Sequence, residues 1–162
     1  MSDNEPLVKE IYIDASPDLV FSFLTERDKM LRWTGLTLDV DPQPCGVFCL
    51  NPDLKEAVRG KYLEVVPPRR IVFTWGWEDD SVGVPPGSTI VEIELTAEGG
   101  GTMVRLTHRD LPAAGDVLPM HDAGWNQMLD RLRIVAEGGD PGPNPGCPTD
   151  RAAPVLRDAQ TT

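Results

Sequence analysis

The sequence contains few cysteines, histidines and aromatic residues. Its 162 residues include three cysteines and two histidines, and aromatic side chains account for 6%. A small, odd number of cysteines in a chain of this length argues against a disulfide framework. Cys45 and Cys49 are four residues apart in one predicted strand, about 13 Å at 3.3 Å per residue, which is too far for a disulfide bond or a shared metal ion. We expect both to be small buried or half-buried residues; the third cysteine is Cys147.

Positive charge and long apolar stretches are also scarce. The chain has 26 acidic and 15 basic residues, which gives a net charge of -11. This charge repels nucleic acid and anionic membrane surfaces, so we predict that the protein binds neither. No apolar stretch reaches about 18 residues, the length of a membrane span. The first ten residues, MSDNEPLVKE, lack the features of a signal peptide. We therefore expect a cytoplasmic protein.

Hydrophobic residues nevertheless make up 40% of the chain, enough for one domain with a substantial core. The clearest pattern lies in residues 116–137, where apolar side chains recur every three or four residues. This period predicts an amphipathic helix of about 30 Å. Gly124, inside that helix, costs about 1 kcal/mol relative to alanine. We therefore expect another part of the backbone to approach the helix closely there.

The rest of the chain predicts one strand, two short helices and then six strands. Residues 7–14 form the first strand, and Ser16 and Pro17 mark the start of a helix over 17–25. A second helix is predicted over 26–33, before Gly35. Six further strands show a period of two. They are residues 36–40, 47–50, 57–66, 71–77, 89–95 and 102–108, with a polar loop at 78–87.

This order of elements predicts an α+β fold. Consecutive strands without crossover helices imply an antiparallel sheet, which we expect to curve around the long C-terminal helix. The domain is predicted to span residues 7–137, after a flexible N-terminus at 1–6. Residues 138–162 are rich in proline and glycine and have almost no apolar pattern. We expect this tail to be disordered, because it cannot bury enough surface to offset its ordering entropy.

Six short sequence segments resemble segments of one known superfamily and occur in the same order as in that superfamily. They are IDASPDLVFSFLT (13–25), LRW (31–33), CGVF (45–48), RGKYLEVVPPRRIVFTWGW (59–77), GGTMVRLTHRDL (100–111) and HDAGWNQMLDRL (121–132). In these segments the chain resembles the SRPBCC superfamily of START-like, or birch-pollen-allergen-like, domains. Within it the chain is similar to activator of heat-shock-protein-90 ATPase homologues. The resemblance covers residues 7 to about 137 and implies a helix-grip fold with space between sheet and helix.

Three departures from that family limit what the resemblance implies. The family usually has a Gly-Gly pair where this chain has Cys45-Gly46, and often a Trp-Trp pair and a proline at Trp33 to Leu36. We expect both positions to border the cavity mouth. The family's chaperone activators also carry an N-terminal domain with an Asn- and Trp-rich motif that this sequence does not contain. The resemblance alone therefore does not imply a chaperone role.

In a helix-grip fold, most of the large apolar side chains point into the space between sheet and helix. Such a set forms either a packed core or a ligand pocket, because pockets are mainly apolar and methionine adapts to irregular space. The candidate ligand-binding residues are Trp33, Phe48, Phe73, Trp75, Trp77, His108, Met120, His121, Trp125 and Met128.

His108 and His121 are the only histidines. Each is either a hydrogen-bonded core residue, a group that orients a ligand, or a general acid or base. No further His, Cys or acidic spacing supports a metal site, and no nucleophile pattern is present, so we predict no metal and no cofactor. If Tyr62 faces inward, alternation places Glu64 inward as well, as a buried carboxylate that needs a partner.

Our leading hypothesis is a protein that binds a small hydrophobic or amphipathic molecule between sheet and C-terminal helix. One alternative is a polyketide cyclase- or hydratase-like enzyme that uses His108 and His121. The other is a protein-interaction module with a filled core and a chaperone-linked role in stress response. An exposed apolar patch around residues 78–87 would support that module. The resemblance also makes a homodimer a candidate, although no interface pattern is readable.

Overall fold

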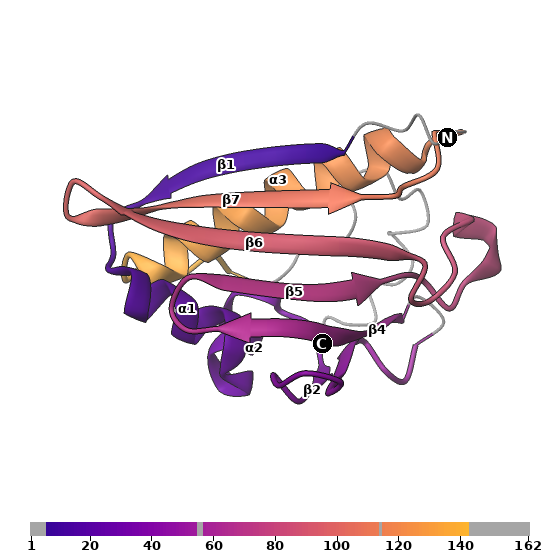
Figure 1. The fold of residues 1–162 in the computed structure, drawn as a ribbon, viewed down its shortest axis with the longest axis horizontal. Coiled ribbons are helices and arrows are strands. Elements are labelled where there is room, and N and C mark those ends of the chain that lie inside the picture. The colour runs from indigo at the N-terminus through magenta and orange to yellow at the C-terminus, as the bar shows by residue number, and fades with distance from the viewer. Residues whose placement is uncertain (1–5, 55–56, 114, 143–162) are drawn as a thin grey trace.

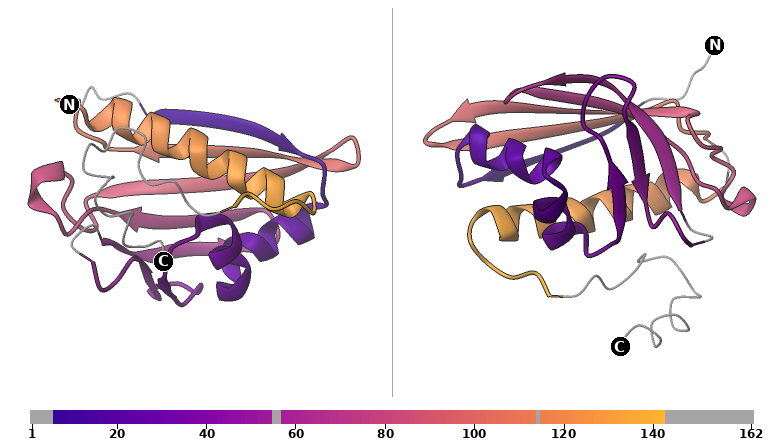
Figure 2. Two further views of the ribbon diagram at one scale, coloured as in Figure 1. Left: turned by 180° about the vertical axis from the view of Figure 1, so that it is seen from behind. Right: turned by 90° about the horizontal axis from the view of Figure 1, so that it is seen from below.

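The computed structural model describes residues 6–54, 57–113 and 115–142. It has an α+β fold in which three helices lie on one face of a curved antiparallel sheet (Figures 1 and 2). The element order is the predicted one, and the only addition among the described residues is a short 3-10 helix at Asp80–Val82 in the predicted polar loop. The helix-grip prediction is therefore confirmed.

The sheet has seven strands in the order β1-β7-β6-β5-β4-β3-β2. Every neighbouring pair is antiparallel, as expected for strands joined without crossover helices. The strands are β1 (Leu7–Ile13), β2 (Leu38–Val40), β3 (Val47–Leu50), β4 (Val58–Val66), β5 (Arg70–Trp75), β6 (Thr89–Glu98) and β7 (Gly101–Arg109).

The helices begin and end where the local sequence predicts. α1 (Pro17–Thr25) has Pro17 in its first turn, and the Ser16 hydroxyl accepts a hydrogen bond from the Leu19 amide at 3.2 Å. α2 (Arg27–Thr34) stops at Gly35, whose φ of 66° reverses the chain. The long helix, α3 (Val117–Ala136), runs behind β1, β7 and β6 in the view of Figure 1.

The two faces of the sheet differ in character. The inner face carries fully buried apolar residues such as Val91, Val104 and Leu106, which pack in one core with Trp125 and Leu132 of α3. The outer face carries ion pairs, and the Arg70 guanidinium alone contacts the carboxylates of Glu64, Glu92 and Glu94. Any apolar ligand site is therefore expected on the inner face.

Glu64 is not the buried carboxylate that strict alternation predicts. The register between β4 and β5 shifts between Tyr62 and Glu64, so Leu63 has no partner on β5. Such a bulge inserts one residue and moves the following side chains to the opposite face. Tyr62 therefore points inward and is buried, whereas Glu64 lies on the outer face and pairs with Arg70 at 3.1 Å.

Two other local expectations were wrong. Outside its own helix turn, a Cβ atom added to Gly124 would have no neighbour within 4 Å among the described residues, so they contain no close backbone approach to α3 there. Cys45 is exposed and lies in the turn before β3 with a φ of 72°, because the strand begins only at Val47. Cys49 is buried as expected, and Cys147 lies outside the described residues.

The segment that follows α3 is held by one buried side chain. The guanidinium of Arg131, which is 5% exposed, donates to the Trp33 carbonyl at 2.6 Å and to the Pro141 and Gly142 carbonyls at 3.3 and 2.9 Å. Of the tail predicted at 138–162, residues 143–162 lie outside the described residues, as do the N-terminal residues 1–5. None of the helices in the described part combines the length and apolar character of a membrane span.

Candidate functional site

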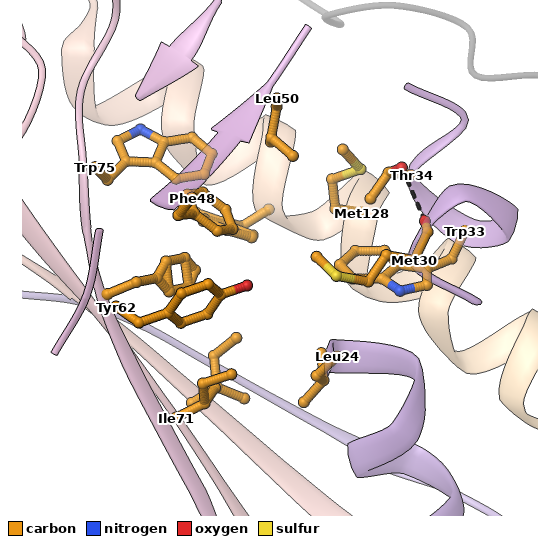
Figure 3. A pocket seen from close by; sticks show the side chains of 13 residues that line it. Leu24, Met30, Trp33, Thr34, Phe48, Leu50, Tyr62, Ile71, Trp75 and Met128 are labelled. Atoms are coloured by element: carbon orange, nitrogen blue, oxygen red, sulfur yellow. Dashed lines mark hydrogen bonds between the residues drawn. The ribbon is translucent and has the colours of Figure 1, made fainter. Parts of the chain in front are cut away.

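A small cavity lies between the inner face of the sheet and the three helices (Figure 3). Six of the ten predicted site residues line it: Trp33, Phe48, Phe73, Trp75, Trp125 and Met128. Seven lining residues were not predicted: Leu24, Met30, Thr34, Leu50, Tyr62, Ile71 and Ile93. Most of these are aliphatic residues whose pattern predicts burial without distinguishing core from cavity.

The cavity has a volume of about 40 Å³, and the whole depression, including space continuous with solvent, measures about 480 Å³. A buried water molecule needs roughly 10–15 Å³, whereas ligand pockets typically span about 300–1,000 Å³. A ligand larger than a few atoms therefore requires lining side chains to move. Met30 and Met128, which lie on the helix side of the cavity in Figure 3, are unbranched and well suited to such movement.

Nearly every polar group on the cavity wall is already hydrogen-bonded within the protein. The Trp33 indole donates to the Phe23 carbonyl at 2.7 Å, and the Thr34 hydroxyl donates to the Met30 carbonyl at 2.8 Å. The indoles of Trp75 and Trp125 donate to histidine nitrogens, as described below.

Tyr62 is the exception. Its side chain is 1% exposed, and its hydroxyl has no hydrogen-bond partner among the described residues. In Figure 3 the hydroxyl points away from the sheet into the cavity. Burial raises the pKa of Tyr62, with a smaller contribution from the nearby negative charge of Asp41, so the phenol is neutral at physiological pH.

The two histidines lie beside the cavity and do not line it. His108 is completely buried at the end of β7. Its Nδ1 accepts a hydrogen bond from the Trp125 indole at 3.0 Å, so the ring proton is on Nε2, which lies 2.8 Å from the Thr89 hydroxyl. The Thr89 hydroxyl in turn donates to the Trp75 carbonyl at 2.9 Å.

His121, in the first half of α3, is also fully partnered. Its Nδ1 is 2.8 Å from the Val117 carbonyl and carries the ring proton. Its Nε2 accepts from two indoles, those of Trp75 at 3.3 Å and Trp77 at 3.1 Å. The rings of His108 and His121 meet edge to face with centroids 5.3 Å apart.

This environment keeps both imidazoles neutral. Burial lowers the pKa of His108 to about 3, with a further contribution from His121. Burial also lowers the pKa of His121, opposed by its hydrogen bond to the Val117 carbonyl. A general base at neutral pH needs a pKa near 7 and a free nitrogen that faces the substrate. Neither imidazole has these properties in this arrangement.

The last two predicted site residues are separate from the cavity lining. Trp77 is half-buried and donates to His121, so it belongs to the histidine cluster. Met120 is half-buried on α3 and neither lines the cavity nor packs against the main core. Of the two positions expected to border the cavity mouth, Trp33 and Thr34 line the cavity, whereas Cys45 and Gly46 do not.

The described residues contain no group of three His, Cys, Asp or Glu side chains close enough to hold a metal ion together. The fold and cavity define the class of this protein: a helix-grip domain with an apolar cavity between sheet and helices. The family model described as "Activator of Hsp90 ATPase homolog 1-like protein" matches residues 14–137. The chain therefore belongs to this family, as the sequence resemblance predicts.

Solved structures with this fold include close and distant relatives. An AHSA1-like protein from Rhizobium etli is 41% identical, with a TM-score of 0.69 over 90% of this chain and 91% of that one. CalU16 from Micromonospora echinospora is 28% identical, with a TM-score of 0.67 over 82% and 76% of the two chains. The Aha1 dimer from Colwellia psychrerythraea is 20% identical, with a TM-score of 0.70 over 84% and 98%, and supports the fold alone. A comparison with curated proteins gave no match.

Proposed function

We propose that this protein binds a small hydrophobic or amphipathic molecule in the cavity between the sheet and α3. The observation that carries the proposal is a cavity with an apolar, largely aromatic wall and two methionines beside it. Aromatic walls and a few fixed polar groups are typical of ligand pockets. The ion-paired outer face of the sheet offers no comparable surface.

The side chains beside the cavity allow it to adapt to a ligand. Met30 and Met128 are unbranched and flexible, so the cavity can enlarge around a molecule that exceeds its volume of about 40 Å³.

The proposal is tested by blocking the cavity at Met128. Met128 is half-buried and lines the cavity, so in Met128→Trp the larger ring can fill it without overpacking the sheet. A compact neutral probe, α-methylstyrene, is titrated into the protein and followed by ¹H–¹⁵N NMR. We expect saturable shifts in wild type at Phe48, Tyr62 and the Trp125 indole, and at least a tenfold loss of affinity in Met128→Trp.

Met120→Trp is the matched control, because Met120 is a half-buried methionine of the same helix that does not line the cavity. It should bind the probe as wild type does. Equal binding by wild type and Met128→Trp, or shifts confined to residues outside the cavity, would contradict the proposal.

A second candidate function is a chaperone-linked interaction module, which the description of the matching family suggests without establishing it. The exposed large hydrophobic side chains among the described residues are Val8, Tyr12, Leu19, Val47, Leu54 and Leu63. None lies within residues 78–87, where a patch would have supported this function. A stoichiometric partner recovered by pull-down at physiological salt would favour it, and the dimeric relative makes a second copy of the chain one candidate.

The enzyme alternative has less support. It requires a histidine that reaches the substrate, whereas the ring nitrogens of His108 and His121 are all partnered and neither ring lines the cavity. An enzymatic turnover that is lost in His108→Gln at neutral pH would support the enzyme alternative.

The cytoplasmic location stays a prediction.

A further inference from the structure

The Tyr62 hydroxyl is a buried polar group without a hydrogen-bond partner among the described residues. A buried hydroxyl without a hydrogen bond is costly, and such groups are rare in folded proteins. Here the hydroxyl points into the cavity between the sheet and the helices (Figure 3). The other polar side-chain atoms of the cavity wall have partners within the chain, so Tyr62 is the one position at which a bound molecule gains a hydrogen bond.

The backbone holds Tyr62 in place from both sides. Its amide donates to the Gly46 carbonyl at 2.9 Å, and its carbonyl accepts from the Cys45 amide at 2.8 Å. On the other side Tyr62 pairs with Phe73 of β5, immediately before the bulge. Bulges next to binding sites commonly re-aim a side chain, and this one separates the inward Tyr62 from the outward Glu64.

The Tyr62 ring is fixed as well. It meets the Phe48 ring edge to face with centroids 5.7 Å apart, and the Phe73 ring lies at 6.0 Å. A hydroxyl on a packed ring loses little conformational freedom when it binds a ligand, so its hydrogen bond contributes to affinity and orientation.

We propose that Tyr62 recognises a neutral ligand through a carbonyl or hydroxyl oxygen, while the surrounding aromatic wall binds the ligand's apolar body. This inference rests on the proposed function and specifies the chemistry of its ligand. A phenol is a good donor, and a carbonyl or hydroxyl oxygen is the complementary acceptor.

Neutrality of the ligand follows from the composition of the wall. None of the cavity-lining residues is a lysine, arginine or histidine, so a carboxylate or phosphate would lose its hydration without gaining a counter-charge. Burial raises the pKa of Tyr62, and the negative charge of Asp41 adds a smaller contribution that likewise disfavours an anion at this position. Fatty acids and acidic metabolites are therefore poor ligands for this cavity.

The test uses three probes of nearly the same shape. Acetophenone carries a carbonyl oxygen, α-methylstyrene replaces that oxygen with a methylene group, and benzoate carries a negative charge. Affinities are measured by NMR titration at pH 7 for wild type and for Tyr62→Phe. This variant removes only the unpaired hydroxyl, so we expect it to fold and to be at least as stable as wild type.

We expect Tyr62→Phe to weaken acetophenone about threefold to tenfold, the usual range for one hydrogen bond, and to leave α-methylstyrene binding unchanged or tighter. Benzoate should bind wild type at least tenfold more weakly than acetophenone. Tyr12→Phe is the matched control, because Tyr12 is the other tyrosine and lies exposed on β1. It should leave all three affinities unchanged.

The outcomes separate this inference from the function on which it rests. If acetophenone and α-methylstyrene both bind in the cavity but Tyr62→Phe leaves their affinity ratio unchanged, the role of Tyr62 is wrong and the binding function stands. Benzoate binding as tight as that of acetophenone would overturn the neutral-ligand inference. If neither neutral probe binds wild type, both the binding function and the role of Tyr62 are wrong.

Discussion

At the scale of single residues, the histidine cluster explains why this protein buries both of its histidines. Three indole N–H groups, from Trp75, Trp77 and Trp125, donate to two imidazole nitrogens. An indole can only donate, so each buried tryptophan needs an acceptor, and a neutral histidine supplies one. The cluster therefore satisfies buried polar groups beside the cavity and keeps the walls formed by Trp75 and Trp125 in place.

This cluster predicts a loss of stability at mildly acidic pH. Because the pKa of His108 is about 3 in the folded protein and about 6.5 when unfolded, the unfolded state binds more protons between these values. The stabilisation is thus complete above pH 6.5 and decreases as pH falls toward 3. We compare urea unfolding at pH 7.0 and pH 5.5. From the titration of His108 alone, we expect the free energy of unfolding to be about 1 kcal/mol lower at pH 5.5.

His108→Gln provides the control, since a glutamine amide can accept from Trp125 and donate to Thr89 without titrating. The loss between pH 7.0 and 5.5 should be about 1 kcal/mol smaller in this variant than in wild type. Identical pH dependence in the two proteins would mean that His108 is not held neutral as described.

Residue patterns place several of the candidate side chains at the cavity. Alternation placed Phe48, Phe73 and Trp75 on the inner face, and helical spacing did the same for Trp125 and Met128. The patterns do not distinguish inner-face residues that line a cavity from those that belong to the filled core. For this reason His108 and His121 are among the candidate ligand-binding residues. That division depends on which side chains meet across the sheet and α3, a property of the folded packing.

At the scale of elements, α3 carries an unexplained weak point at Gly124. Beyond its own helix turn, a methyl group there would meet no atom of the described residues within 4 Å, and glycine in a helix interior costs about 1 kcal/mol relative to alanine. We therefore expect Gly124→Ala to raise the free energy of unfolding by roughly 0.5–1 kcal/mol in urea denaturation.

Gly60→Ala is the opposing control. A Cβ atom at Gly60 would lie 1.9 Å from the Thr74 carbonyl oxygen on β5, so the strands would have to separate. This variant should be strongly destabilised. A destabilised Gly124→Ala protein would indicate a close contact at α3 that the structure does not contain.

The bulge in β4 is a feature that the alternation of residues in the sequence does not predict. A strict period of two over residues 57–66 places Tyr62 and Glu64 on one face, and one inserted residue reverses that relation. Composition gives no signal for the insertion, because Leu63 is as acceptable in a strand as its neighbours. Tyr62 is not among the predicted site residues, although its position is central to the ligand chemistry proposed above.

At the scale of the whole molecule, the two faces of the sheet have separate roles. The outer face is occupied by ion pairs, including Arg105 with Glu10 and Arg109 with Glu92. The inner face holds the core, the histidine cluster and the cavity, and α2 and α3 are tied together where Arg131 donates to the Trp33 carbonyl. The element order and antiparallel sheet could be predicted from the sequence, because hydrophobic periods specify local structure and short connections specify which strands pair.

The central claim is that the cavity holds a small molecule, and native mass spectrometry of protein purified gently from its own host tests it most directly. We predict a discrete added mass that is lost on denaturation, absent from Met128→Trp and retained by Met120→Trp. Wild-type protein with the mass of its sequence alone, or the same added mass in Met128→Trp, would contradict the claim.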